Sequence, residues 1–215
     1  MLYPVRLLGI NAKIAADPAD HIAKILKTKQ FYEADLLEAL MPHLQNGDVV
    51  VDVGAHVGNH SAFFEQFNEV IAVEPCPKTA KIWKRTMRES GAKRATLCES
   101  PAGAASGQPF AIREFSNNTG RTQARPSKGG ELKSVTVDQL VGDRTCAVLK
   151  IDVEGHEPGV IVGAAKTLRR SNVVVAVEAG TEEALDAVDR VLSALGYKRG
   201  KRYCATPTYI YEKAK

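Results

Sequence analysis

The stretch Val49-Val50-Val51-Asp52-Val53-Gly54-Ala55-His56-Val57-Gly58-Asn59 decides the fold of this chain. It opens with a continuous run of β-branched residues, which is typical of a strand buried on both faces of a parallel sheet. Gly54 then suits a tight turn, and Gly58 suits close packing at the start of a helix. The stretch therefore predicts a buried strand that turns sharply into a helix, which is the basic unit of a parallel α/β sheet.

The rest of the chain repeats this alternation of apolar strands and amphipathic helices. Further strands are predicted at 69–73, 146–153 and 172–177, with a weaker one at 95–98. Helices are predicted at 59–67, 77–90, 157–168 and 181–195. Aromatic residues on both sides of Pro207 predict an antiparallel hairpin at the sheet edge, between Tyr197 and Lys213. The pattern indicates a doubly wound α/β fold with helices on both faces of a mostly parallel sheet.

The N-terminal part differs from this alternation. Apolar residues recur at helical spacing over 17–29 and 31–44, and the turn Asn46-Gly47-Asp48 follows them. We therefore expect an N-terminal helical extension or lid over residues 1–46 and a ligand-binding domain over residues 47–215.

A second irregular stretch, 103–131, is rich in Gly, Ser, Asn and Pro and has little periodicity. It is long for a connector, so we interpret it as a functional loop or flap. Within it, the segment 117–121 is either a flexible turn or a flap that closes over a substrate.

Composition and charge exclude several classes of protein. The chain has 215 residues, of which 44% are hydrophobic and 25% charged, which is ordinary for a globular protein. The net charge of +4 comes from 29 basic and 25 acidic residues mixed along the chain, so nucleic acid is a disfavoured partner. No window reaches about 18 consecutive apolar residues, and no export signal is recognisable, so we expect a cytoplasmic protein without a membrane span. The four cysteines are far apart and have no zinc-ligand spacing.

The glycine turn and an acidic residue after the next strand predict the ligand. Glu74 follows Gly54 by 20 residues, where a carboxylate can bind both hydroxyls of an adenosine ribose. Asp52 would repel a pyrophosphate, but it suits a positively charged ligand such as S-adenosylmethionine. The G-x-x-x-x-G-K-[ST] pattern of phosphate-binding loops is absent from the sequence. The sequence therefore favours S-adenosylmethionine over a dinucleotide or ATP.

Three motifs resemble those of FkbM-type S-adenosylmethionine-dependent methyltransferases. They are Asp52-Val-Gly-Ala-His-Val-Gly58, Val73-Glu74-Pro75 with Pro77, and Leu149-Lys-Ile-Asp-Val-Glu-Gly-His-Glu157. The likeness covers roughly residues 48–179, and members of that family usually carry Asn where this chain has His56. The resemblance implies the Rossmann-like, seven-stranded sheet of class I methyltransferases, with the cofactor held over the carboxyl ends of the strands.

The resemblance also implies roles for individual residues. Those expected to contact the methionine side of the cofactor are Asp52, Gly54, Ala55, His56 and Gly58, with Ser61 near the cofactor carboxylate. Glu74, followed by Pro75, would hold the ribose, and Glu99 and Ser100 would lie beside the adenine.

The end of the strand predicted at 146–153 carries the candidate catalytic groups. Methyl transfer to a hydroxyl requires alignment of two reactants and removal of a proton from oxygen. His156 is one candidate base, and Asp152 or Glu154 could act as the base or orient the acceptor hydroxyl. A magnesium ion held by these residues and Glu178 is a second interpretation, which we do not favour because the sequence shows no fixed ligand spacing.

We therefore predict a methyltransferase that transfers a methyl group from S-adenosylmethionine to a hydroxyl of a sugar or another small metabolite. Two alternatives remain open: an RNA methyltransferase, and a non-catalytic S-adenosylmethionine-binding protein. An RNA enzyme would need a positively charged groove, whereas the sequence offers only scattered basic groups.

Overall fold

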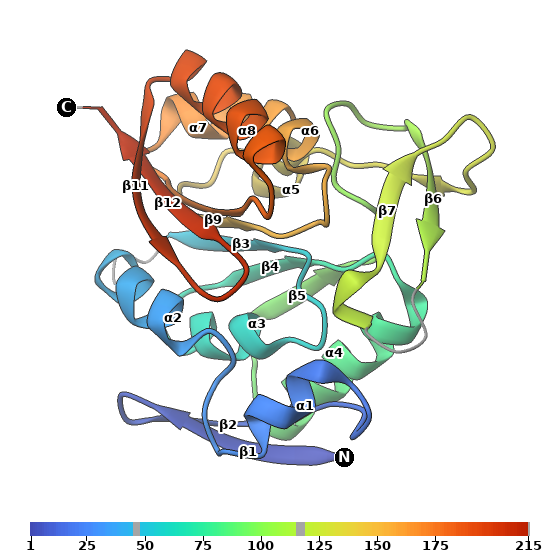
Figure 1. The fold of residues 1–215 in the computed structure, drawn as a ribbon, viewed down its shortest axis with the longest axis vertical. Coiled ribbons are helices and arrows are strands. Elements are labelled where there is room, and N and C mark those ends of the chain that lie inside the picture. Colours follow the sequence, from blue (N-terminus) through green and yellow to red (C-terminus); the bar gives the residue numbers. More distant parts are fainter. Residues whose placement is uncertain (45–47, 115–118, 215) are drawn as a thin grey trace.

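A seven-stranded sheet forms the centre of the computed structural model, which describes residues 1–44, 48–114 and 119–214 (Figure 1). The strand order is β11-β12-β10-β9-β3-β4-β5. The strands are β3 (Val49–Val53), β4 (Val70–Val73), β5 (Ala95–Cys98), β9 (Cys146–Ile151), β10 (Val174–Glu178), β11 (Tyr197–Tyr203) and β12 (Thr208–Lys213). Neighbouring strands from β5 to β10 are parallel, while β12 is antiparallel to both β10 and β11. The predicted fold class, with its C-terminal antiparallel hairpin, is confirmed.

Helices cover both faces of the sheet (Figure 1). The first face carries α1 (His21–Leu26), α2 (Ala34–Leu40) with the short η1 (Met41–His43), α3 (Asn59–Phe64) and α4 (Pro77–Ser90). The second face carries α5 (Val137–Val141), α6 (Glu157–Val162), α7 (Ala165–Arg170) and α8 (Glu182–Ala194). Within the described residues, we find no helix with the length and apolar character that a membrane span requires.

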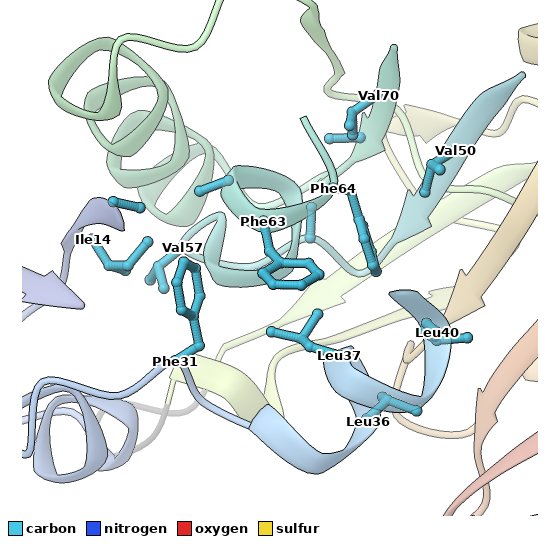
Figure 2. Close-up of a cluster of buried hydrophobic side chains, with 14 of the residues drawn as sticks. Ile14, Phe31, Leu36, Leu37, Leu40, Val50, Val57, Phe63, Phe64 and Val70 are labelled. Atoms are coloured by element: carbon cyan, nitrogen blue, oxygen red, sulfur yellow. The ribbon is translucent and has the colours of Figure 1, made fainter. Parts of the chain in front are cut away.

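The strand side chains alternate between two apolar cores, one on each face. Val50 belongs to the first core, where it lies near Phe64 (Figure 2), and Val51 belongs to the second. In the first core Phe31 meets Phe63 edge to face at 5.6 Å, which joins the N-terminal segment to α3. Because β3 is buried on both sides, its sequence shows no polar alternation.

The helix predicted at 157–168 is divided in two. Helix α6 ends at Val162 and α7 begins at Ala165. A Cβ on Gly163 would lie 2.1 Å from the carbonyl oxygen of Gly103, so the backbones of these two residues pack directly against each other. This close crossing coincides with the break between the helices and is invisible in the local periodicity. By contrast, α4 has the predicted bounds, from Pro77 to the left-handed Gly91 that follows its end.

The N-terminal segment is only partly helical, which corrects the expectation for residues 1–46. Before α1 the chain forms an antiparallel hairpin of β1 (Leu2–Leu7) and β2 (Ile10–Ala15). The hairpin lies beside α4, where the backbone of Ala15 donates to Thr86 and Lys13 exchanges two hydrogen bonds with the Ser90 hydroxyl. The boundary expected between residues 46 and 47 lies outside the described residues.

The 103–131 stretch is also more regular than expected. It contains the short helix η2 (Thr119–Arg121) and two strands, β6 (Pro109–Arg113) and β7 (Gln123–Pro126). The two strands form a three-stranded sheet with β8 (Leu132–Lys133). We call the segment from η2 to the end of β7 the flap. Asn117 and Asn118, which belong to the predicted turn or flap, lie outside the described residues.

Candidate active site

A cavity of about 650 Å³ opens at the carboxyl ends of β3, β4, β9 and β10. One side, the strand-end wall, consists of residues at or just after the ends of these strands; among them are Gly54, Ala55, His56, Glu74, Pro75, Asp152, Glu154 and Glu178. The opposite side, the outer wall, comes from the N-terminal segment and the flap and includes Asp20, Tyr32, Glu33, Thr119, Ala124 and Arg125. Residues far apart in the sequence thus enclose one space at the edge where ligands of α/β sheets bind.

The turn after β3 places two requirements on position 54 that only glycine meets. The φ of Gly54 is +80°, and a Cβ there would lie 1.7 Å from the carbonyl oxygen of Asp152. The backbone of Gly54 therefore closely approaches the end of the neighbouring strand β9, at Asp152. The backbone N–H groups of Gly54 and Ala55 both donate to the carbonyl of Val73, at 3.0 and 3.1 Å.

Glu74 is held at the cavity by two backbone donors. Its Oε1 accepts from the N–H of Cys76 at 2.9 Å, and its Oε2 accepts from the N–H of His56 at 3.0 Å. Burial raises the pKa of Glu74 to about 7, although both hydrogen bonds oppose the shift. Each carboxylate oxygen has a second lone pair, so this fixed group can accept two further hydrogen bonds.

Three of the predicted cofactor-binding residues lie beneath the strand-end wall. Ser61 donates to the fully buried Asp52 at 2.6 Å and accepts from the indole N–H of Trp83 at 3.0 Å. Gly58, at φ +88°, packs so closely that a Cβ would lie 2.9 Å from the side chain of Met87. None of Asp52, Gly58 and Ser61 is among the described residues that line the cavity. These residues support the turn from below.

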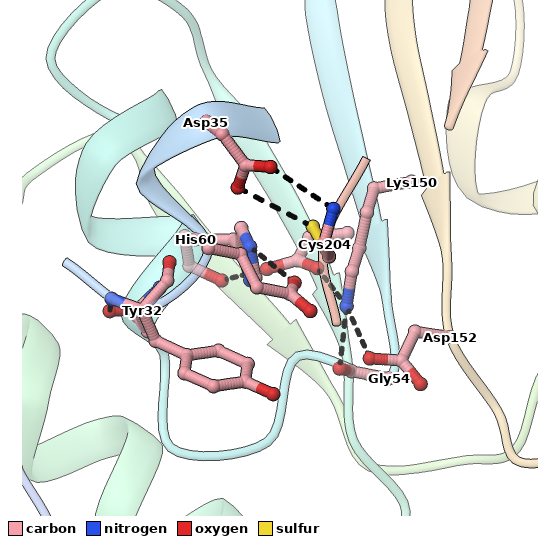
Figure 3. Close-up of polar contacts among 11 residues, drawn as sticks. Tyr32, Asp35, Gly54, His60, Lys150, Asp152 and Cys204 are labelled. Carbon is pink, nitrogen blue, oxygen red and sulfur yellow. Dashed lines mark hydrogen bonds and ion pairs between the residues drawn. The ribbon is translucent and has the colours of Figure 1, made fainter. Parts of the chain in front are cut away.

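Lys150 joins the parts of the strand-end wall (Figure 3). Its ammonium lies 3.1 Å from Asp152 Oδ2 and 3.7 Å from Asp52 Oδ1, and it donates to the carbonyl of Gly54 at 3.3 Å. Burial alone would lower the pKa of Lys150, but the carboxylates, Asp152 foremost, raise it above its ordinary value. The buried cation therefore stays charged and orients one oxygen of Asp152.

Three carboxylates crowd the ends of β9 and β10. One oxygen each of Asp152, Glu154 and Glu178 can be chosen so that all three lie within 4.8 Å of one another. Burial, followed by the charge of Asp152, raises the pKa of Glu178 to about 9. Among the described residues, this is the set that could hold a divalent cation.

The turn after β9 is secured on two sides. Glu154 and Gly155 both have positive φ, +57° and +103°. From below, Glu157 Oε1 accepts from the N–H groups of Gly155 at 2.8 Å and Val153 at 3.3 Å. From the flap, Arg125 donates to the carbonyls of Glu154 at 2.8 Å and Gly155 at 3.1 Å. The flap is thereby joined to the turn that carries Glu154.

The N-terminal part of the outer wall contributes Tyr32 and Glu33. The amide of Asn59 accepts from the N–H of Tyr32 at 3.0 Å and donates to its carbonyl at 2.9 Å. Glu33 has a left-handed backbone, φ +56°, and its carboxylate lies 3.2 Å from Nε2 of His60. Burial, with the charges of Glu33 and Asp152, raises the pKa of Tyr32 above its ordinary range.

A half-buried cluster of three side chains joins the outer wall to the strand-end wall. The hydroxyl of Thr119, on the flap, donates to Asp20 at the start of α1 and lies 2.7 Å from Nε2 of His56. Because the Thr119 proton goes to Asp20, the Nε2 proton of His56 completes the chain. Burial lowers the pKa of His56, against the opposing charge of Asp20, which favours the neutral imidazole. The N-terminal segment, the flap and the glycine turn after β3 therefore meet at Asp20, Thr119 and His56.

Three residues predicted for the site stand apart from the main cavity. His156 lies in a separate void of about 20 Å³, with its ring edge-on to Phe110 at 5.2 Å, and burial lowers its pKa. Glu99 is half-exposed and pairs with Lys84 at 2.5 Å. Neither these two nor Ser100 lines the main cavity among the described residues. The role expected of His156 as base does not fit this position.

Sequence reasoning missed most of the outer wall. Tyr32 and Glu33 were not selected, because nothing local relates them to the strand ends. Lys150 lies inside the Leu149–Glu157 motif, with Asp152 two residues after it and Asp52 on another predicted buried strand. A lysine in a buried strand with two aspartates available as partners was therefore a usable signal of the site.

Comparisons with known proteins agree with this geometry. The chain is 29% identical over 184 residues to the hexuronic acid methyltransferase AglP of Haloferax volcanii, covering 81% of this chain and 73% of that protein. The structure resembles the methyltransferase FkbM from Methylobacillus flagellatus KT, with a TM-score of 0.56, 17% identity, and coverage of 92% of this chain and 56% of that one. It also resembles a precorrin-6y C5,15-methyltransferase from Geobacter metallireducens GS-15, with a TM-score of 0.55, 16% identity, and coverage of 85% and 88%.

The comparison with models of protein families is the one that assigns the chain to a family. The model of the methyltransferase FkbM domain matches residues 52–199, which include the whole strand-end wall and the flap. The predicted resemblance is confirmed, and this chain belongs to the FkbM methyltransferase family.

Proposed function

We propose that this protein transfers a methyl group from S-adenosylmethionine to a hydroxyl of a sugar or another small metabolite. Membership of a methyltransferase family supports the reaction class. The relative from Haloferax volcanii is named as a methyltransferase of hexuronic acid, which supports a sugar as the acceptor.

The carboxylate of Glu74 is the observation that carries this proposal. It is buried, fixed by two backbone N–H groups and next to the glycine turn, and each oxygen can still accept a hydrogen bond. This arrangement fits the two neighbouring hydroxyls of an adenosine ribose. Pro75 lines both the main cavity and the small apolar void beside it, which suits the flat face of an adenine.

The acidic cavity also suits a cationic cofactor. S-adenosylmethionine, when bound, supplies a methyl group activated by a positively charged sulfonium. In our proposal, Asp152 and Glu154 surround the acceptor hydroxyl, hold it in line and take its proton. Lys150 holds one oxygen of Asp152 at 3.1 Å, which fixes the direction in which this carboxylate faces. This mechanism assigns no step to His156.

A magnesium ion is not required by this mechanism. If one binds, Asp152, Glu154 and Glu178 are the residues whose spacing fits it. Activity that persists in EDTA would support the metal-independent form of the proposal, and complete loss that magnesium restores would contradict it.

Calorimetric titration with S-adenosylhomocysteine tests the cofactor site, with ATP and NAD as controls. We expect selective binding that strengthens as the pH rises through about 7, because Glu74 accepts two ribose hydroxyls best when ionised. Glu74→Gln should weaken binding by roughly 10- to 100-fold and flatten the pH dependence. The matched control Glu99→Gln should change neither, since Glu99 lies outside the cavity lining. Equal effects of the two variants would refute the ribose assignment.

The same assays separate the rival functions. Strong, salt-sensitive binding of RNA would favour an RNA methyltransferase. Selective cofactor binding without turnover of any acceptor would favour a non-catalytic role.

A further inference from the structure

The N-terminal segment places a carboxylate in a cavity that is already acidic. Glu33 lies outside the region matched by the family model, residues 52–199, yet it lines the cavity together with Asp152 and Glu178. Its side chain is 7% exposed, and its carboxylate lies 3.2 Å from His60. The chain therefore adds a feature to the site from outside the family domain.

The backbone at Glu33 is held in an uncommon conformation. Its φ of +56° costs free energy for a residue with a side chain, and such positions persist where the surroundings hold them. Glu33 precedes α2, but its side chain makes no capping hydrogen bond to that helix. The neighbouring Tyr32 is fixed by the two hydrogen bonds to Asn59. Helix capping thus does not explain the position, and the side chain is buried at the cavity instead.

Acidic groups outnumber permanent cations in the cavity lining. Lys150 and Arg125 are the permanent cations among the described lining residues. Lys150 is paired with Asp152 and Asp52, whereas Arg125 donates to the neutral carbonyls of Glu154 and Gly155 and keeps its charge. The same lining carries seven carboxyl groups, those of Asp20, Glu33, Glu74, Asp152, Glu154, Glu157 and Glu178. An acceptor carrying a carboxylate or phosphate would therefore enter a cavity in which acidic groups predominate.

We propose that Glu33, Asp152 and Glu178 form an acceptor subsite that binds an uncharged polyhydroxy compound and disfavours an acceptor bearing a carboxylate or phosphate. The inference rests on the proposed methyltransferase function and narrows its substrate class. Hydroxyl groups donate to carboxylates, so a neutral sugar with several hydroxyls fits these acceptors. It also separates this chain from a relative whose name specifies a hexuronic acid.

An acceptor panel tests the charge preference directly. The wild-type protein is incubated with S-adenosylmethionine and methyl glucoside, glucuronate or glucose 6-phosphate, and S-adenosylhomocysteine formation is measured, in EDTA and again with magnesium. We expect kcat/KM for the neutral glucoside to exceed that for either anion by at least about tenfold in both conditions. Glucuronate or the phosphate turning over as fast as the glucoside, with or without magnesium, would overturn the inference.

The Glu33→Gln variant locates the effect, with Glu38→Gln on the exposed side of α2 as its control. Glu33→Gln should raise KM for the glucoside by roughly tenfold with little change in kcat, while S-adenosylhomocysteine affinity stays at the wild-type value. Glu38→Gln should match the wild type. An unchanged KM in Glu33→Gln would remove Glu33 from the subsite.

The possible failures are distinguishable. Absence of S-adenosylhomocysteine binding would overturn the proposed function, and the inference with it. Cofactor binding together with turnover of anionic acceptors alone would leave the function standing and refute the charge preference. Cofactor binding with no turnover of the panel would overturn the inference as well.

Discussion

The two walls of the cavity are built in different ways. The strand-end wall is made of residues at or just after the ends of buried strands, so the parallel sheet brings Gly54, Glu74 and Asp152 to one edge. The outer wall is made of segments about 100 residues apart in sequence, joined by the bond between Asp20 and Thr119. The first wall follows from local turn chemistry and sheet topology, whereas the second depends on long-range polar contacts.

This difference has a functional counterpart. The family match includes the entire strand-end wall, and the proposed cofactor contacts of Glu74 lie there. The match begins after the N-terminal segment that carries Glu33. In our proposals, Glu33 therefore adds to the acceptor side from outside the family match, whereas the methyl-donor contacts of Glu74 lie within it.

Removing Lys150 should have the largest effect, because this residue connects the parts of the strand-end wall. Lys150→Met leaves the buried Asp52 without its cation and frees Asp152, which should lower the free energy of unfolding by about 3–5 kcal/mol. Urea unfolding measures this change. Lys84→Met, which removes the half-exposed partner of Glu99, should cost no more than about 1 kcal/mol. Equal losses in the two variants would show that the buried network does not hold this wall.

Gly54→Ala should have the next largest effect, confined to the strand-end wall. The new Cβ would lie 1.7 Å from the carbonyl of Asp152, in addition to the strain of φ +80°. We expect a loss of roughly 3 kcal/mol or more in the free energy of unfolding. Gly91→Ala is the matched control, since Gly91 has φ +72° with nothing within 4 Å, and it should lose only about 1–2 kcal/mol. Similar losses would mean that backbone strain alone, without the close approach, accounts for the effect.

Thr119→Val should have the smallest effect and act on the outer wall. It removes the hydroxyl between His56 and Asp20 and leaves a buried carboxylate one hydrogen bond short, at a cost of about 1–2 kcal/mol. We expect faster amide hydrogen exchange in α1 and in the flap, with little change in β3 and β4. Thr122→Val, on the same flap but outside this cluster, serves as the control. Faster exchange throughout the sheet would show that the two walls are not independent.

The elements predicted well are those whose signals are local and redundant. Helix α4 has both a proline at its start and a glycine after its end, and β3 is a continuous β-branched run. The position of the N-terminal hairpin beside α4 was not predictable, since it depends on Thr86 and Ser90, more than 70 residues away. The break between α6 and α7 coincides with a backbone crossing near Gly103, which no periodicity can reveal.

The residues of the candidate site also divide into those placed by local sequence signals and those placed by tertiary contacts. Glu74 and Gly54 both line the cavity, because their positions after buried strands fix where the backbone places them. Asp52 and Ser61 were selected for the ligand but lie below the wall. Alternation along β3 decides which face the side chain of Asp52 occupies, and Ser61 of α3 donates to it there. His156 follows the same strand as Asp152, yet its ring packs against Phe110 of β6.

The sequence by itself determined the doubly wound sheet, the glycine turn and the acidic residue after the second parallel strand, because short-range sterics and hydrophobic patterning specify these features. Only the tertiary structure decided which side chains share the cavity. The contacts of Lys150 with Asp52, of Glu33 with His60 and of Thr119 with Asp20 join residues distant or separately placed in the chain. Such contacts form only when packing removes polar groups from water and leaves them each other as partners.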